Sequence, residues 1–374
     1  MGRKIVARLT RFTLLPAIVF ALLGASAAAA TTVTPVMTGL DNPRGLAFGP
    51  EGALYVAEAG SGGDGPCQVL RPADLGGALS CYGPTGRISR YWRGEQEPVV
   101  TGLPSYATAS GQGATGPHDL ALHGHQALVT IGWGENPALR NTPPSAVWQQ
   151  FGHLAHAYLE GQGKWGLEAD VSAYEAAANP DGGPVDSNPY GILGLGEKHA
   201  LVTDAGGNDL LDVSKGQIST VAVFPSRSTT PPHPSCVFPP FPPVTDSVPN
   251  AVTVGPDGAY YVGELTGAPF CAGNANVYRV VPGQAPTVFC GGFTTIMDLA
   301  WGPDGALYVA QYSNGPVFFA TPGNVVRVGP GCTKTPVTPP LSQPGSLAFG
   351  PDGKLYVSIN AGSPGIGEVV RIDP

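Results

Sequence analysis

A phrase repeated along the chain limits the fold more than any other feature of the sequence. It consists of two short runs of β-forming residues around a Gly-Pro-Asp-Gly or Gly-Pro-Glu-Gly turn. Clear copies begin at Gly45, Ala251, Asp298 and Ser346, and weaker copies begin at His118 and Gly191. The last three turns begin at Gly255, Gly302 and Gly350, which are 47 and 48 residues apart. Six copies with a period near 50 residues are typical of a propeller or a similar array.

Each copy predicts a β-hairpin, because proline presets φ in the turn and the closing glycine accepts a positive φ. Third strands are expected at Gly86–Trp92, Asn276–Val281, Asn324–Val328 and Glu368–Ile372. Fourth strands are expected at Glu97–Gly102 and Ala285–Cys290. Four antiparallel strands per repeat make a propeller blade.

The two ends of the chain predict how the ring closes. The last repeat stops after its third strand, at Pro374, and Val33–Leu40 matches the fourth-strand phrase Pro98–Leu103. We therefore expect an all-β, six-bladed β-propeller at residues 31–374, closed by the N-terminal strand, which completes the last blade. A β-sandwich or an open solenoid would not explain this circular offset, and closure removes exposed strand edges.

The first half of the repeat array is longer than the second, with 206 residues between Gly49 and Gly255. The extra length falls in four expected loops, Glu58–Thr85, Pro104–Thr115, Trp133–Gln150 and Glu160–Ser187. A further hairpin is expected at Phe151–Val171, a short helix at Ser172–Asn179, and a proline-rich spacer at Pro231–Pro249. Because loops on a rigid scaffold often carry binding residues, we expect the functional site among them.

The N-terminal 30 residues have the pattern of a secretory signal peptide. Residues 1–11 are basic, Phe12–Gly24 is a short apolar run, and Ala25–Ala30 contains only small residues. The alternative, an uncleaved anchor, requires about 20 apolar residues to span a bilayer. We therefore expect a secreted or periplasmic protein with no stable membrane insertion after cleavage.

Six cysteines agree with export. The simplest of the 15 pairings is sequential: Cys67–Cys81, Cys236–Cys271 and Cys290–Cys332. A zinc site is the competing interpretation, but the chain has no CxxC spacing, and an oxidising compartment favours disulfides. The formal net charge is −8, although the first 30 residues contain four basic and no acidic residues. An acidic body of this kind excludes nucleic acid as a partner.

Several longer motifs resemble the ScyD/ScyE family of exported bacterial proteins with NHL-like repeats. These motifs are Asp41–Gly45, Gly83–Gly86, Gly116–Asp119, Pro180–Gly191, Asp204–Asp209 and Gly263–Gly267. The resemblance covers residues 33–374, and the phrase PDGGPVDSNPYG is its most specific part. It implies a six-bladed propeller of the TolB-like or NHL type. It implies little chemistry, although cyanobacterial members are associated with late, periplasmic steps of pigment assembly.

Two positions in each repeat are expected to face the central channel. One precedes the inner strand and the other ends the second strand, so both are expected at the same mouth. The polar candidates at these positions are Arg44, His118, Tyr190, Asn250, Glu58, Asp204, Glu264 and Gln311, joined by Asn208 from a glycine-rich loop. We interpret the pair His118-Asp119 as orienting rather than catalytic. Aromatic residues in the loops could form a recognition surface or pack, and we favour packing; they are Tyr106, Trp133, Trp148, Tyr312, Phe318 and Phe319.

Three functions fit these candidates. The first is a ligand- or partner-binding module for a small molecule, a glycan or a protein. The second is a lactonase-type hydrolase that uses calcium, held by Glu58, Asp204, Asn250 and Glu264, since carboxylate and amide oxygens suit this cation. The alternative role of these acids is structural, as acceptors for backbone N–H groups that hold the blades together. The third function is a periplasmic tailoring oxidoreductase like the family's pigment role, an analogy that rests on the fold.

Overall fold

A computed structural model describes residues 1–2, 31–70, 77–161, 163–228, 244–315 and 321–373. The predicted signal peptide therefore lies almost entirely outside the described residues, as does most of the expected spacer at Pro231–Pro249. Residues Thr31–Pro374 form one compact unit.

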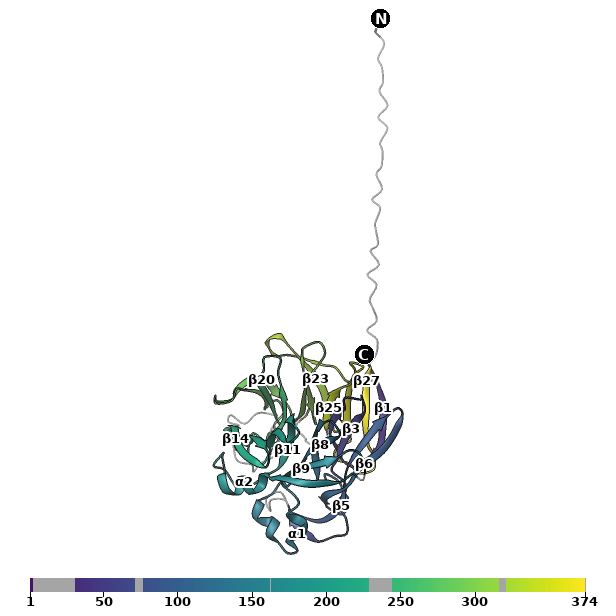
Figure 1. Cartoon of the computed structure of the whole chain (residues 1–374). Coiled ribbons are helices and arrows are strands. Elements are labelled where there is room, and N and C mark those ends of the chain that lie inside the picture. Colours follow the sequence, from purple (N-terminus) through teal and green to yellow (C-terminus); the bar gives the residue numbers. More distant parts are fainter. Residues whose placement is uncertain (3–30, 71–76, 162, 229–243, 316–320, 374) are drawn as a thin grey trace. The chain divides into compact units, whose positions relative to one another are not determined.

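The unit is a six-bladed β-propeller, as the repeats predicted (Figure 1). Each blade is an antiparallel sheet with one strand innermost, and the strands follow in order from the inner strand outward. The first three blades are β2 (Pro43–Phe48), β3 (Leu54–Glu58), β5 (Ala78–Trp92) and β6 (Glu95–Ala107); β7 (Pro117–His123), β8 (Gln126–Ile131), β9 (His153–Tyr158) and β10 (Trp165–Asp170); and β11 (Pro189–Gly196), β12 (His199–Asp204), β13 (Asp209–Ser214) and β14 (Gln217–Val223). The last three are β17 (Pro249–Val254), β18 (Tyr260–Glu264), β19 (Ala275–Val280) and β20 (Thr287–Phe293); β21 (Ile296–Trp301), β22 (Leu307–Gln311), β23 (Asn324–Gly329) and β24 (Thr333–Pro336); and β25 (Ser346–Phe349), β26 (Leu355–Ile359), β27 (Gly367–Asp373) and β1 (Thr32–Leu40).

The N-terminal strand closes the ring. β1 pairs antiparallel with β27, from Thr32 opposite Asp373 to Leu40 opposite Gly367, and Figure 1 shows the purple strand beside the yellow one. Met37 and Leu40 of β1 are each 1% exposed, because they pack between the last and first blades. The prediction from the circular offset is confirmed.

Among the described residues, the hydrophobic core comprises six clusters between neighbouring blades and two smaller clusters. The cluster between the first and second blades is the largest and contains Trp133, Trp148 and Phe151, each fully buried. Tyr106 stacks edge-on against Trp133 and Phe151. The expected packing role is therefore confirmed for Tyr106, Trp133 and Trp148, and Tyr312 packs in the same way against Met297 and Ala361. Phe318 and Phe319 lie outside the described residues.

Extra elements occupy the long loops of the first half. β4 (Cys67–Leu70) pairs with the start of β5, and η2 (Pro137–Asn141) and α1 (Ser145–Trp148) follow β8. α2 (Val171–Ala178) follows β10, where the sequence predicted a helix. A small sheet of β15 (Arg227–Ser228) and β16 (Val244–Thr245) precedes the fourth blade, and η3 (Pro330–Cys332) precedes β24.

Two of the predicted disulfides are present. Cys67–Cys81 joins β4 to β5, and Cys290–Cys332 joins β20 to η3 of the next blade. Cys236 lies outside the described residues, so its pairing with Cys271 stays a prediction. The disulfides fit an oxidising compartment. None of the helices in the described ranges has the length and apolar character needed to cross a bilayer.

Candidate functional site

The second residues of the inner strands β2, β7, β11, β17 and β21 meet at the axis of the ring. The rings of His118 and Tyr190 lie 4.4 Å apart between centroids. Asn250 Nδ2 donates to the carbonyl oxygen of Met297 at 3.3 Å. Arg44 donates through Nη2 to the carbonyl oxygen of Ala114 at 3.2 Å. The first five blades thus contribute to one axial cluster: Arg44, His118, Asn250 and Met297, which are buried, and Tyr190, which is half-buried.

His118 is neutral in this cluster. Burial and the nearby positive charge of Arg44 lower the pKa of its imidazole from 6.5 to about 3. Its Nδ1 lies 3.2 Å from the carbonyl oxygen of Pro189, at the start of the next blade. A histidine with such a low pKa does not carry a proton at neutral pH, so it contributes packing and a hydrogen bond rather than charge.

Asp119, beside His118, joins the second blade to the third. Its Oδ2 accepts from the backbone N–H of Ile192 at 3.0 Å. Asp298 does the same between the fifth and sixth blades, where it accepts from the N–H of Leu347 at 3.0 Å. Burial raises the pKa of both carboxyl groups, and Asp298 further raises that of Asp119 across the axis. This geometry agrees with the orienting role expected for the His118-Asp119 pair.

Glu58 and Glu264, at the ends of second strands, hold neighbouring segments in place instead of facing the axis. Glu58 Oε2 accepts from the N–H of Asp41 at 2.7 Å and from Arg87 Nη2 at 2.8 Å. Glu264 accepts from Ser247 Oγ at 2.8 Å and forms an ion pair with Arg227 at 2.6 Å. Both carboxylates are fully buried, and their oxygens are occupied by these donors.

Asp204 and Gln311 serve the same purpose in the third and fifth blades. Asp204 accepts from Ser187 Oγ at 2.6 Å and from the N–H of Asn188 at 2.5 Å. Gln311 Oε1 accepts from the N–H of Thr294 at 2.7 Å. Each of these side chains binds the loop that enters its own blade.

The two expected rows of residues therefore do not converge on one pocket. Adjacent strands of a sheet are about 4.8 Å apart, so the end of a second strand lies one strand farther from the axis than the inner strand. Its side chain meets the loop that enters the blade before it can reach the axis. Among the described residues, no three His, Cys, Asp or Glu side chains form a group that could hold a metal ion. The structure does not assemble Glu58, Asp204, Asn250 and Glu264 into a calcium site.

Asn208 itself has a left-handed backbone conformation, with φ at 53°, and its side chain holds backbone and side-chain groups of neighbouring segments. Its Oδ1 accepts from the N–H of Val248 at 2.9 Å, and its Nδ2 donates to Asp181 Oδ2 at 3.0 Å. Asn208 thereby ties the glycine-rich loop to the segment that leads into the fourth blade.

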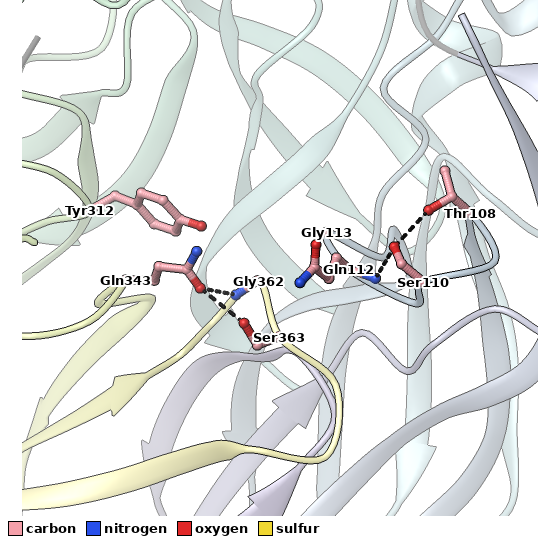
Figure 2. A pocket seen from close by; sticks show the side chains of 8 residues that line it. All are labelled: Thr108, Ser110, Gln112, Gly113, Tyr312, Gln343, Gly362 and Ser363. Carbon is pink, nitrogen blue, oxygen red and sulfur yellow. Dashed lines mark hydrogen bonds between the residues drawn. The ribbon is translucent and has the colours of Figure 1, made fainter. Parts of the chain in front are cut away.

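A cavity with a volume of about 430 Å³ lies beside the axial cluster. Three blades line it: the loop after β6, the end of β22, and the loops around β25 and β26. Its lining residues are Thr108, Ser110, Gln112, Gly113, Tyr312, Gln343, Gly362 and Ser363. None of these eight side chains is charged. Figure 2 shows the amides of Gln112 and Gln343 pointing into the space between the two loops.

Hydrogen bonds hold the two sides of this cavity in place. The N–H of Gly113 donates to the carbonyl oxygen of Gly362 at 3.0 Å, which joins the first blade's loop to the sixth blade's loop. Gln343 Oε1 accepts from the N–H of Gly362 and from Ser363 Oγ, both at 3.3 Å (Figure 2). The lining is therefore held together by contacts between distant parts of the chain.

Tyr312, one of the loop aromatics that the sequence singled out for recognition or packing, connects the cavity to the axial cluster. Its ring packs with Met297 and Ala361, and burial raises the pKa of its hydroxyl to about 12. The available signal was positional. Tyr312 directly follows Gln311, and the positions that correspond to it in the first two blades, Ala59 and Gly132, are small. Gln343, Gly362 and Ser363 gave no comparable signal.

Comparisons with known proteins identify the architecture. No family model and no curated protein matches the chain. A candidate oxidoreductase (glucose dehydrogenase) from Thermus thermophilus is 17% identical over 92% of this chain and 100% of that chain, with a TM-score of 0.53. The soluble aldose sugar dehydrogenase from Escherichia coli is 12% identical over 92% and 99% of the two chains, also with a TM-score of 0.53. At such low identities, the similarity shows that the six-bladed propeller fold is shared, and it carries no information about activity.

Proposed function

We propose that this chain is an exported propeller, of the kind that its ScyD/ScyE-like motifs suggest, and that it binds a small neutral ligand rich in hydroxyl groups. The ligand site is the cavity lined by Gln112, Tyr312 and Gln343. The uncharged lining of this cavity is the observation that carries the proposal. A saccharide is the chemical class that fits it best.

The chemistry of the lining favours a neutral ligand over an ion. A charged ligand would lose part of its hydration in the cavity without gaining a counter-ion, which is unfavourable. Amide and hydroxyl groups both donate and accept hydrogen bonds, as a sugar requires. Gln112 and Gln343 supply amides from opposite sides, and Ser110 and Ser363 supply hydroxyls.

Tyr312 adds a neutral polar group and an apolar surface. Because its pKa is about 12, the phenol stays protonated throughout the neutral range. Only 4% of Tyr312 is exposed, so it presents its hydroxyl and a small part of its ring to the cavity (Figure 2), and its packing against Met297 holds them in position. Ligand pockets commonly combine an aromatic surface with a few fixed polar groups.

Calorimetric titration of the exported chain with neutral mono- and disaccharides, beginning with D-glucose, tests this proposal. D-gluconate serves as the charged comparison. We expect Gln343→Ala to weaken binding at least about tenfold, equivalent to about 1.4 kcal/mol. Gln217→Ala, which changes an exposed glutamine on β14, is the matched control and should have no effect.

Three results would count against the proposal: no binding by any neutral saccharide, equal binding of gluconate, or full affinity in Gln343→Ala. The sugar dehydrogenases that share the fold suggest one further assay. Reduction of an added electron acceptor by a bound aldose would extend the binding function to the oxidoreductase alternative. Saccharide binding without reduction of the acceptor would favour a ligand-binding module that does not catalyse oxidation.

A further inference from the structure

The third blade lacks the positive charge that accompanies the corresponding buried acid in two other blades. Glu58 of the first blade meets Arg87 directly opposite it on β5, and Glu264 of the fourth blade meets Arg227. In the third blade, the residue directly opposite Asp204 is another acid, Asp209. Like charges at directly opposite positions of an antiparallel pair are destabilising.

Asp209 has no compensating contact of its own among the described residues. The residue is 1% exposed, and neither Oδ1 nor Oδ2 has a hydrogen-bond partner within the described part of the chain. Burial raises the pKa of its carboxyl group well above the usual range, and the charges of Asp204, Glu175 and Asp181 raise it further. A buried carboxylate without a partner is costly, and such groups in native proteins are paired or bind metal.

Glu175 brings a second carboxylate to the same place. It lies on the inward face of α2, one turn after the buried Val171, and is 2% exposed. Its Oε1 has no hydrogen-bond partner among the described residues. A Cβ added at Gly207 would lie 2.9 Å from Glu175 Oε2 and 3.3 Å from Asp204 Cγ, so both acids crowd the same glycine.

The surroundings supply negative charge only. The charged groups that act on Glu175 are Asp204, Asp181 and Asp186, and together with burial they raise its pKa to about 8. Asp204 and Asp181 are already occupied. Asp204 accepts from Ser187 and from three backbone N–H groups. Asp181 accepts from Gly183 and Asn208. The fully buried carboxylate oxygens without a partner among the described residues are both oxygens of Asp209 and Oε1 of Glu175.

We propose that Asp209 and Glu175 bind a divalent cation, calcium, between β13 and α2. The cation takes the place that arginine side chains occupy beside Glu58 and Glu264. Two carboxylates supply oxygen ligands to a hard cation, and calcium tolerates irregular geometry with water completing its coordination. The described residues contain no group of three or more His, Cys, Asp or Glu side chains that could hold a metal ion. The proposed site has two such ligands. This site is separate from the saccharide cavity and does not use Glu58, Asn250 or Glu264.

Calcium titration of the exported chain, purified without metal and then exposed to CaCl2, tests the site. Calorimetry should give one calcium ion per chain, and the melting temperature should rise with calcium and fall again with chelator. Asp209→Asn and Glu175→Gln should each weaken calcium binding at least about tenfold. Asp212→Asn is the matched control, because Asp212 lies on the same strand but faces His199.

A second readout separates a cation site from a merely structural pair of acids. Without calcium, Asp209→Asn should melt at or above the temperature of the calcium-free parent, because the substitution removes like-charge repulsion. With calcium, it should melt below the calcium-bound parent. If Asp209→Asn does not fold, Glu175→Gln provides the same comparison.

Either of two results would overturn the proposal. One is the absence of calcium binding by the folded parent chain at calcium concentrations up to about 10 mM, which is well above the dissociation constants of extracellular calcium modules. The other is unchanged calcium affinity in both Asp209→Asn and Glu175→Gln. The first result would show that protons alone neutralise the two acids. Neither result bears on the saccharide cavity, so the two proposals are tested independently.

Discussion

Acidification should destabilise the propeller through His118, and the magnitude follows from its surroundings. The pKa of this imidazole is 6.5 in an ordinary environment and about 3 in the folded protein, because it is buried beside Arg44. The unfolded chain therefore binds a proton more readily than the folded chain between these values. The titration of His118 therefore leaves the unfolding free energy unchanged above pH 6.5 and lowers it progressively as the pH falls toward 3.

The expected loss is about 1.4 kcal/mol for each pH unit in this interval, or about 5 kcal/mol in total. Asp119 and Asp298 act in the opposite direction, because their carboxyl pKa values are raised in the folded state. The parent must therefore be compared with a variant that keeps both acids. His118→Gln serves this purpose, since its amide does not titrate and can still donate to the carbonyl oxygen of Pro189.

Urea unfolding followed by tryptophan fluorescence at pH 6 and pH 4 measures the effect. Over these two pH units, the parent should lose about 2.5 kcal/mol more unfolding free energy than His118→Gln. The reasoning is refuted if the two proteins lose the same free energy between pH 6 and pH 4. Parallel behaviour would mean that His118 titrates alike in the folded and unfolded chains.

Two further predictions concern the joints between segments. Glu58→Gln should lower the unfolding free energy by about 2 to 3 kcal/mol, because Arg87 loses a buried partner and keeps only Asp41. Urea unfolding measures this loss. A smaller loss in the double variant Glu58→Gln/Arg87→Met than in Glu58→Gln would attribute the effect to the ion pair. Deletion of residues 31–40 should lower the melting temperature and promote self-association, because it uncovers the edge of β27 and removes the buried Met37 and Leu40. Light scattering coupled to size exclusion follows the association, and a monomer with the parent's melting temperature would contradict the closure argument.

Local patterns were sufficient to predict the blades. Each Gly-Pro-Asp-Gly turn predicted one hairpin, and the hairpins at Gly255, Gly302 and Gly350 are present. The match between Val33–Leu40 and Pro98–Leu103 predicted the pairing of β1 with β27. These features could be predicted because turn chemistry and strand propensity act over a few neighbouring residues.

The directions of the side chains at the blade ends could not be predicted in the same way. Glu58, Asp204, Glu264 and Gln311 occupy equivalent positions and were expected to face the axis. In the structure, each accepts a hydrogen bond from the loop that enters its blade. Which donor reaches such a side chain depends on the path of a loop, and that path is set by packing against the neighbouring blade.

The repeat pattern and the offset between the chain ends were enough to specify six closed blades, because those signals are local and recur along the chain. The saccharide cavity and the Asp209–Glu175 pair depend on folding over long distances in the sequence. The N–H of Gly113 meets the carbonyl oxygen of Gly362 only after the ring closes, and Glu175 reaches Gly207 only when α2 packs against the third blade. Such sites are made by side chains from separate elements, and no short segment contains the information that places them together.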